Sequence, residues 1–324
     1  MVKEQVFISL VIYTYNDETI IEETLINLDQ AVNRVFKNYE IIIVNDCSED
    51  NTLIRAREAI KQMHGDTTII NLSRKHGVEH AMMAGLNRSM GDFVYEIESA
   101  VIDYPIVLIQ DMFKTATKGG FDIVAASSGL TSWKSKLFYM LLNKVSYLQL
   151  SLSTEIVRLV TRRALNSMLS LKEKVRYRKA LYEYTGYSKK LIKYNSTTNR
   201  SIKSKQLNRE NISLAFDALV SFSNFGLKMS HILSSLFFVF SVFMGSYALY
   251  NYLFNKSVVQ GWTTLMILIS FGFAGIFFIV GIIGEYISRI LVELQNRPFY
   301  STKSVEMYKE KKNLAIYEVA VSKE

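Results

Sequence analysis

Hydrophobic and polar residues form two alternating patterns along the first 125 positions of the chain. Short apolar runs predict buried strands at 7–13, 39–44, 68–72, 93–97 and 120–124. Between them, apolar residues at helical spacing predict amphipathic helices at 18–36, 51–63 and 79–90. Because strands and helices alternate, we expect an α/β domain with a mostly parallel sheet whose connecting loops gather at one edge.

Two long apolar segments follow in the last third of the chain. No Asp, Glu, Lys or Arg occurs between Lys228 and Lys256, or between Lys256 and Glu285. Each segment is longer than the ~20 residues that cross a bilayer core of about 30 Å, so we predict transmembrane helices at 229–254 and 262–286. A pair of buried helices in a soluble protein is the alternative.

Charges beside these segments predict how they are oriented. Lys228 precedes the first segment, and Arg289, Arg297 and Lys303 follow the second, whereas the short link between them carries one lysine. By the positive-inside rule, both ends of this hairpin lie in the cytoplasm. We therefore expect a cytoplasmic domain at 1–207, an amphipathic juxtamembrane helix at 208–228 and a cytoplasmic tail at 287–324.

Composition agrees with a soluble part joined to a membrane part. Hydrophobic residues make up 49% of the 324 residues and the mean hydropathy is +0.11, although 21% of the residues are charged. The single cysteine, Cys47, excludes a disulfide framework and favours a reducing compartment. The amino-terminal residues predict the start of a strand, and we expect no cleaved signal peptide.

The formal net charge of +8 is unevenly distributed, with lysine and arginine concentrated at 133–209 and 297–323. Basic residues beside apolar helices favour contact with anionic lipid over contact with nucleic acid. Residues 133–152 carry lysines and aromatic residues among apolar ones. This segment predicts either a helix lying in the membrane interface or an ordinary amphipathic surface helix.

Two acids follow the predicted strand at 93–97. Glu98 comes directly after this strand, and Asp103 stands five positions further on. Ligands of α/β folds bind outside the carboxyl ends of the strands, and a pair of carboxylates there commonly holds a divalent metal. Glu98 and Asp103 are therefore candidate metal ligands.

Two further loops carry small polar and acidic groups. Residues 15–18 follow the first predicted strand, and residues 45–50 follow the second. Such groups can bind a nucleotide base and ribose, with helix N-capping as the alternative interpretation. The chain has no GxGxxG after its first strand, no Walker loop and no HExxH, and its four histidines lack metal-ligand spacing. A nicotinamide-binding unit and a zinc site are therefore disfavoured.

Several motifs resemble those of one family. Residues 15–18 are similar to a YNE segment, residues 45–52 to DDGSxDxT, residues 73–92 to SRNFG…AAxxAGL…GD, and residues 158–162 to FRLxxR. The most specific match is GIIGEYISRILVELQNRPFY at 281–300, to GxxGEYxGRxxxExxxRPxY. The chain resembles the polyprenyl-phosphate glycosyltransferases of glycosyltransferase family 2, which include dolichol-phosphate-mannose-synthase-like and bactoprenol-glucosyltransferase-like enzymes. The resemblance covers nearly the whole chain.

The resemblance implies a GT-A fold, a nucleotide-sugar donor, Mg²⁺ or Mn²⁺, and a membrane-embedded polyprenyl phosphate as acceptor. It places Glu98 and Asp103 at the metal, and Arg158 and Arg162 at phosphates, which suits the bidentate guanidinium. The donor-binding residues that it implies are Tyr15, Asn16, Glu18, Asn45, Asp46, Arg74 and Gly85. It also implies a bacterial inner membrane with the catalytic domain in the cytoplasm. Nucleic acid is not expected, and homo-oligomerisation stays open.

Departures from the family pattern are concentrated at the predicted site. Where the family has DxDLQDP, this chain has ESAVIDY, so that Ala100 replaces the second acid and Ile102 the glutamine. Asn45 stands at the first acid of the DDGS segment. Three functions stay open: an inverting transferase that acts on the cytoplasmic face, a catalytically impaired relative that serves as a membrane partner or scaffold, and a basic membrane-surface protein that binds lipid or nucleic acid.

Overall fold

The structure is a computed structural model that describes residues 3–128, 155, 157–171, 177–195, 261–294 and 298–309, with isolated positions between 232 and 254. The helices predicted at 133–152 and 208–228, and most of the span predicted at 229–254, lie outside the described residues. The chain divides into two compact units. The first comprises Met1–Asn143, Leu150–Leu214 and Pro298–Glu324, and the second comprises Lys144–Gln149 and Ala215–Arg297.

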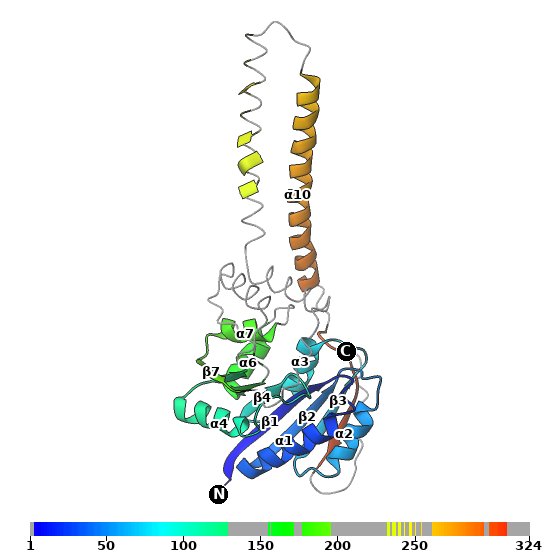
Figure 1. Ribbon diagram of the computed structural model, residues 1–324, viewed down its shortest axis with the longest axis vertical. Coiled ribbons are helices and arrows are strands. Elements are labelled where there is room, and N and C mark those ends of the chain that lie inside the picture. Colours follow the sequence, from blue (N-terminus) through cyan, green and yellow to red (C-terminus); the bar gives the residue numbers. More distant parts are fainter. Residues whose placement is uncertain are drawn as a thin grey trace. The chain divides into compact units, whose positions relative to one another are not determined.

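The first unit is an α/β domain built on one sheet (Figure 1). Its strands are β1 (Glu4–Thr14), β2 (Phe36–Asn45), β3 (Asp66–Leu72), β4 (Phe93–Ile97), β5 (Ile123–Ser127), β6 (Val157–Thr161), β7 (Lys189–Lys193) and β8 (Thr302–Tyr308). Its helices are α1 (Ile21–Val35), α2 (Thr52–Ile60), α3 (Val78–Arg88), α4 (Leu108–Gly119), α6 (Arg162–Ser170) and α7 (Arg178–Thr185). The alternation of strands and helices predicted for the first 125 residues is confirmed.

The strands of the sheet have the order β7-β5-β6-β4-β1-β2-β3-β8. Parallel pairs join β1 to β2 and β4, β2 to β3, and β5 to β7. Antiparallel pairs join β6 to β4 and β5, and β8 to β3. The sheet is therefore mixed but mostly parallel, as predicted: six strands run in one direction, and β6 and β8 run against them. Its antiparallel strands β6 and β8 come from charged segments in which no apolar run marks a strand.

Two predicted boundaries shift for local reasons. The first helix begins at Ile21 because the backbone N–H groups of Ile20 and Ile21 both donate to Asp17 O, at 3.0 Å, in a turn that occupies the predicted start. The strand predicted from 120 begins at Ile123. Gly120 has a φ of +66° and ends α4, a left-handed conformation that glycine adopts without steric cost.

Helices cover both faces of the sheet. On one face, fully buried apolar residues of β1 and α1, Leu10 and Leu25 among them, belong to the main core. Burial of each such side chain contributes about 1.5–3 kcal/mol. On the other face, α3 lies so close to β1 and β2 that a Cβ at Gly85 would come within 2.3 Å of Val11 and 2.8 Å of Val44. These contacts fix the strand ends from which the loops of the site extend.

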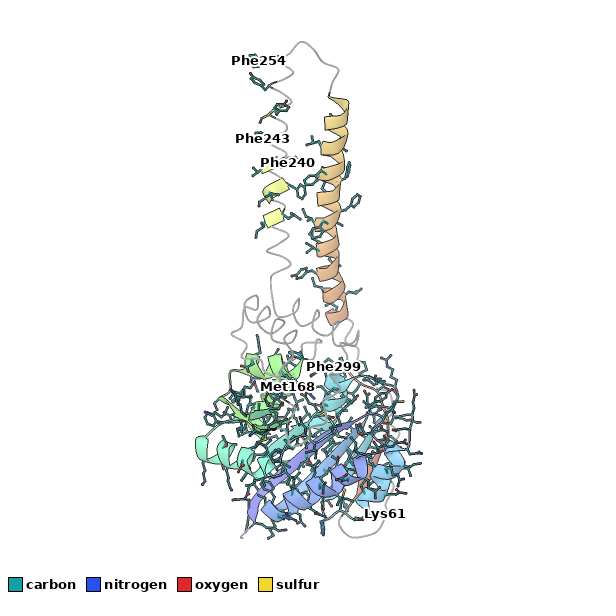
Figure 2. The ribbon with its side chains drawn as sticks, viewed as in Figure 1. Lys61, Met168, Phe240, Phe243, Phe254 and Phe299 are labelled. Carbon is teal, nitrogen blue, oxygen red and sulfur yellow. The ribbon has the colours of Figure 1, made fainter. Side chains whose placement is uncertain are left out.

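The second unit contains α10 (Trp262–Leu294) and the isolated residues between 232 and 254, whose phenylalanines Phe240, Phe243 and Phe254 are labelled in Figure 2. The ring of Phe271 on α10 lies 5.9 Å from that of Phe240 and 5.4 Å from that of Phe237. These aromatic contacts join α10 to the preceding segment within this unit.

The surface of α10 is largely apolar. Its exposed side chains include Phe277 at 70% and Leu294 at 75% exposure. The span predicted at 262–286 lies within this helix. Over the residues that the structure describes, no helix meets the combined length and apolarity needed to cross a membrane.

The strand β8 brings the end of the chain back to the first unit. It pairs with β3 from Thr67↔Tyr308 to Leu72↔Thr302. Glu306 accepts two hydrogen bonds from Arg57, from Nε at 2.9 Å and from NH2 at 2.6 Å. Part of the predicted tail at 287–324 is therefore a strand of the α/β domain.

Candidate active site

The loops after β1 and β2 form one hydrogen-bonded unit. Asn16 N–H donates to Ser48 Oγ at 3.1 Å, and Asn16 Oδ1 accepts from Glu49 N–H at 2.9 Å. Glu18 Oε2 accepts from Asn51 N–H at 3.0 Å. Because β1 and β2 are parallel neighbours, their carboxyl ends meet at one edge of the sheet. The structure thus brings together Asn16 and Glu18, two residues predicted to bind the donor.

Asp46 lies fully buried after β2 and joins three segments. Its Oδ2 accepts from Tyr13 OH at 3.1 Å and from Gly77 N–H at 2.8 Å, and its Oδ1 accepts from His76 N–H at 2.7 Å. Burial, with the Asp46 charge, raises the pKa of Tyr13 well above its usual value, so the phenol stays a donor. The carboxylate of Asp46 therefore holds the loop after β3 against the first two strands.

The other residues predicted to bind the donor differ in position. Tyr15 and Arg74 lie at the edge of the sheet, where Lys75 Nζ stands 4.4 Å from the centre of the Tyr15 ring and Arg74 is exposed. Asn45 is buried at the end of β2. Gly85 lies in the packing interface of α3 with β1 and β2, where it allows the close approach of the helix. The side chains of Tyr15 and Arg74 lie at the loops, and Asn45 Oδ1 accepts from Ser48 N–H in the loop after β2 at 3.1 Å.

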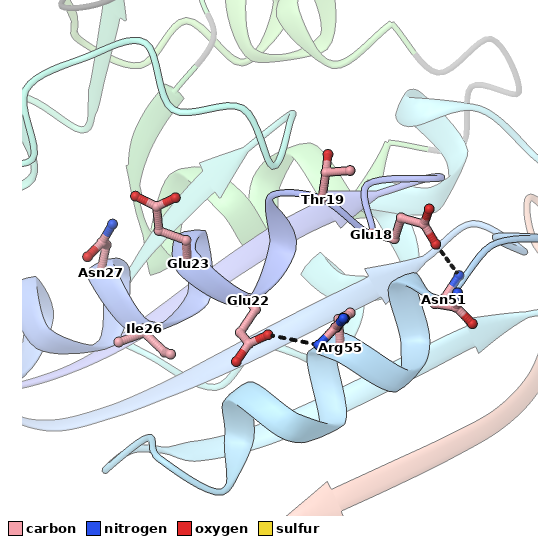
Figure 3. Close-up of a pocket in the computed structure, with 8 residues that line it drawn as sticks. All are labelled: Glu18, Thr19, Glu22, Glu23, Ile26, Asn27, Asn51 and Arg55. Carbon is pink, nitrogen blue, oxygen red and sulfur yellow. Dashed lines mark hydrogen bonds and ion pairs between the residues drawn. The ribbon is translucent and has the colours of Figure 1, made fainter.

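A groove of about 730 Å³ runs along α1 and α2 (Figure 3). It is lined by Glu18, Thr19, Glu22, Glu23, Ile26, Asn27, Asn51 and Arg55. Glu22 and Arg55 face each other across it with 3.7 Å between their charged atoms, and both side chains are exposed. Such an exposed pair contributes at most about 1 kcal/mol. Of the predicted site residues, Glu18 lines this groove.

The carboxyl end of β4 carries a buried cluster of charges. Arg158 NH1 donates to Glu96 Oε2 at 2.9 Å, across the register that joins β4 to β6. Its Nε and NH2 donate to Glu155 Oε2 at 3.1 and 2.8 Å. Tyr182 OH donates to the other carboxylate oxygen of Glu96. Arg158, predicted to meet a phosphate, is 2% exposed and bound by protein carboxylates.

Glu98 extends this cluster toward α7. Its Oε1 accepts from Arg178 NH2 at 2.9 Å, and Lys179 Nζ lies 3.8 Å from its Oε2. Burial would raise the pKa of Glu98, but the charges of Lys179, Arg178 and Arg158 outweigh burial and hold this pKa below its usual value. Glu98 is therefore ionised and paired within the chain.

Asp103 and Ala100 have other partners. Asp103 is buried, and its Oδ1 accepts from Tyr194 OH at 2.9 Å. Ala100 is fully buried, and its carbonyl accepts from Thr24 Oγ1 at 2.7 Å. In the described parts of the chain, no three His, Cys, Asp or Glu side chains gather into a group that could hold a metal ion.

Arg162 lies at the opposite end of β6 from Arg158. Its Nε and NH2 donate to Gly91 O at 2.8 and 2.5 Å. Because β6 runs antiparallel to β4, Arg158 pairs with Glu96 near the end of β4, whereas Arg162 follows β6 near the start of β4. Four residues of strand span about 13 Å. The structure therefore does not bring the two predicted phosphate-binding arginines together.

Sequence reasoning missed Arg178 and Lys179. They belong to the basic segment at 133–209, for which the sequence favours contact with anionic lipid. The signal that points to them is Glu96, a charged residue inside a buried strand, because a buried carboxylate needs a cation nearby. Glu96 shows that a partner exists but does not show which residue it is.

Comparison with known sequences decides the family. The profile described as Glycosyl transferase family 2 matches residues 9–206. The chain belongs to this family. The match extends from β1 to β7 and contains the loops and the charge cluster described above. The prediction of a glycosyltransferase is thereby confirmed.

Relatives of this glycosyltransferase match nearly its whole length. The uncharacterized glycosyltransferase YkcC of Bacillus subtilis (strain 168) is 30% identical over 300 residues, which cover 90% of this chain and 92% of the relative. The SfII prophage-derived bactoprenol glucosyl transferase of Shigella flexneri is 28% identical over 308 residues, which cover 91% of this chain and 97% of the relative.

A solved structure matches the fold of this glycosyltransferase. Glucosyl-3-phosphoglycerate synthase from Mycobacterium tuberculosis, in complex with phosphoglyceric acid, aligns with a TM-score of 0.51 and 16% identity. The alignment covers 68% of this chain and 80% of that one. The glycosyltransferase therefore has an α/β, GT-A-like fold with a mixed sheet.

Proposed function

We propose that this glycosyltransferase moves a sugar from a nucleotide-sugar donor to a polyprenyl phosphate, such as undecaprenyl or dolichyl phosphate, with inversion at the sugar. The observation that carries the proposal is the similarity to bactoprenol glucosyl transferase, which covers 91% of this chain and 97% of that relative. An alignment of this extent includes both the family domain and the apolar α10. We expect a lipid acceptor to involve both parts.

We assign the donor to the edge of the sheet where the loops after β1, β2 and β3 meet. Tyr15 and Arg74 present an aromatic ring and a guanidinium there, groups suited to a nucleobase and to phosphate oxygens. Asn16 and Glu18 hold the first two loops together. Asp46 acts as a positioning residue, since its oxygens accept hydrogen bonds from the protein.

Transfer to a phosphate needs little help with proton removal. The second pKa of a phosphate monoester is about 6, so the acceptor is largely dianionic at pH 7. One of its oxygens attacks the anomeric carbon from the side opposite the leaving group. The bond from that carbon to the donor diphosphate breaks, and the electron pair leaves with the nucleoside diphosphate. The demanding part is the negative charge that grows on this leaving group.

The residues at the end of β4 do not fit the Mg²⁺ or Mn²⁺ that the resemblance implies. Both oxygens of Glu98 face protein cations, and Ala100 offers no side-chain oxygen. Asp103 Oδ1 already accepts from Tyr194 OH, and its buried Oδ2 has no hydrogen-bond partner among the described residues. Mg²⁺ and Mn²⁺ bind through carboxylate oxygens together with water and substrate phosphates, and this one oxygen is all that the described residues at this strand end leave for them. We therefore assign the stabilisation of the leaving diphosphate to charged residues of the chain itself.

We propose a bacterial inner membrane as the location, with spans at 229–254 and 262–286 and the domain at 1–207 in the cytoplasm. Exposed apolar side chains along α10 favour contact with lipid. The topology of the sheet gives a second argument. Strand β7 precedes the apolar segments and β8 follows them, and both strands belong to the same sheet. The chain must therefore cross a membrane an even number of times between them.

Product formation by the full-length protein in detergent tests the proposed function. The protein is incubated with undecaprenyl phosphate and, separately, with each member of a panel of nucleotide sugars. We expect one donor to yield a lipid-linked sugar of inverted anomeric configuration, with one nucleoside diphosphate released per product. Omission of the lipid is the control. A protein that binds a nucleotide sugar but forms no product with any donor would favour the membrane partner or scaffold instead.

A further inference from the structure

The carboxylate of Glu98 already faces protein cations on both of its oxygens. Arg178 NH2 donates to Oε1 at 2.9 Å, and Arg158 NH2 lies 3.9 Å from the same oxygen. Lys179 Nζ lies 3.8 Å from Oε2. A metal ion at Glu98 would have to displace these groups or share the carboxylate with them.

Charges in this cluster nearly balance without a metal, among the residues that the structure describes. Its acids are Glu79, Glu96, Glu98, Glu155 and Glu183, and its cations are Arg158, Arg178, Lys179 and Lys189. A divalent ion on Glu98 would stand beside the cations of α7 in a mostly buried place, where water screens charge weakly. Their mutual repulsion opposes the binding of Mg²⁺ or Mn²⁺.

Two nitrogen donors of Arg178 lack a hydrogen-bond acceptor among the described residues. Its side chain is fully buried, and its Nε and NH1 make no hydrogen bond to the described residues. Nε is 3.2 Å from Glu79 Oε2, which gives an ion pair, but NH1 has no such neighbour among the ion pairs of the described residues. Buried donors in folded proteins are nearly always satisfied. An anion rich in oxygen atoms, bound at the end of β4, would supply the missing acceptor.

We propose that Arg178 and Lys179 take the place of a divalent metal in this transferase, and that the donor diphosphate binds at the carboxyl end of β4 without one. The inference rests on the proposed nucleotide-sugar donor. When the bond from the anomeric carbon to the diphosphate breaks, its electron pair stays on the diphosphate oxygen, and an acceptor phosphate oxygen forms the new bond. The two fixed cations offset the growing charge. Glu98 acts as a positioning residue that holds them.

Binding of nucleoside diphosphates to the full-length protein in detergent tests the proposal. UDP, GDP, ADP, CDP and dTDP are each titrated by calorimetry, first in excess EDTA and then in Mn²⁺. We expect at least one of them to bind in EDTA, with an affinity that Mn²⁺ raises by less than about fivefold. A larger gain with Mn²⁺, or no binding of any of them in EDTA, would overturn the proposal.

Variants of Lys179 make the test specific. Lys179→Met should weaken diphosphate binding in EDTA by about 10- to 100-fold, the size of one charge-assisted hydrogen bond. Lys179→Arg keeps the charge and should retain most of the affinity, which separates a lost contact from a misfolded protein. Lys190→Met removes an exposed lysine on β7 and is the matched control. Equal binding by Lys179→Met and Lys190→Met would show the proposal to be wrong.

Two outcomes distinguish this inference from the proposed function. Sugar transfer to undecaprenyl phosphate that requires Mn²⁺ would leave the proposed function standing and overturn the inference. Diphosphate binding that is insensitive to EDTA and depends on Lys179, without transfer to the lipid, would uphold the inference and contradict the proposed function.

Discussion

Arg158 is a buried residue whose guanidinium donates to Glu96 and Glu155. Its removal would leave both carboxylates in the interior without their main cation. An uncompensated buried charge of this kind costs about 3–5 kcal/mol, so we expect Arg158→Met to lower the free energy of unfolding by that amount. The measurement is denaturant unfolding of the full-length protein in detergent.

Arg163 provides the matched control for this substitution. It pairs with Asp122, but its own side chain is 68% exposed. Water screens such a pair, so Arg163→Met should lower the free energy of unfolding much less than Arg158→Met does. Equal losses from the two arginine variants would contradict a structural role for the buried cluster.

Glu155 makes the stability of the domain depend on pH. Burial alone would raise its pKa, but Arg158, Lys189 and Lys179 lower it from 4.5 to about 2. A carboxylate with a depressed pKa stabilises the folded state above its unfolded pKa, and this stability is lost as the pH falls from about 4.5 toward 2. The slope for one group is about 1.4 kcal/mol per pH unit at most.

Unfolding free energies measured between pH 7 and pH 2 test this dependence. We expect the wild-type protein to lose stability below about pH 4.5, and Glu155→Gln to lose it with a shallower slope, because the variant lacks the titrating group. Glu79 has the opposite effect on stability above pH 4.5. Burial raises its pKa, so its contribution to the stability of the folded state falls as the pH rises. Identical slopes in the two proteins below pH 4.5 would exclude Glu155 as the source.

At the scale of elements, β8 is held to the sheet by a charge as well as by its backbone. Glu306 accepts two hydrogen bonds from Arg57 and one from Asn71 Nδ2, at 2.8 Å. Charge-assisted hydrogen bonds contribute about 1.5–3 kcal/mol, so Glu306→Ala should speed amide hydrogen exchange in β8 by about 10- to 100-fold. Lys303→Ala changes an exposed residue of the same strand and should leave exchange unchanged. Similar exchange in both variants would rule out this role for Glu306.

Sequence pattern predicted some elements well and others not at all. The strands β1 to β4 carry apolar runs, and their order with the helices follows from those runs. By contrast, β6 contains Arg158 and β8 contains Glu306. Polar surface segments also carry such charged residues, so the sequence pattern does not mark these two segments as strands. Their partners lie 62 and 249 positions away in the sequence, at Glu96 and Arg57. Pairings over such distances leave no periodic trace along the chain.

The candidate site shows the same division. Its place at the ends of parallel strands, with Glu98 after β4, follows from topology and could be predicted. The groups that face Glu98 could not, because Arg178 and Lys179 reach it from a helix 80 positions further along the chain. Chemistry at the site therefore depends on tertiary contacts that the motif alone does not contain.

At the scale of the whole molecule, the sheet constrains the membrane topology of the chain. Because β7 and β8 belong to the same sheet, the two spans proposed between them must return the chain to its starting side. Cysteine labelling can test this, since Cys47 is the only native cysteine. In a Cys47→Ser background, Ser257→Cys places a thiol in the proposed outer link, and Lys309→Cys places one just after β8.

A membrane-impermeant maleimide should label the thiol at position 257 in intact spheroplasts, because the link between two spans lies on the outer side. The thiol at position 309 should react only after the membrane is permeabilised, since β8 holds it beside the cytoplasmic domain. Labelling of position 309 in intact spheroplasts would place the domain outside. Protection of both positions until permeabilisation would mean that neither apolar segment crosses, and that α10 meets the lipid from one side only.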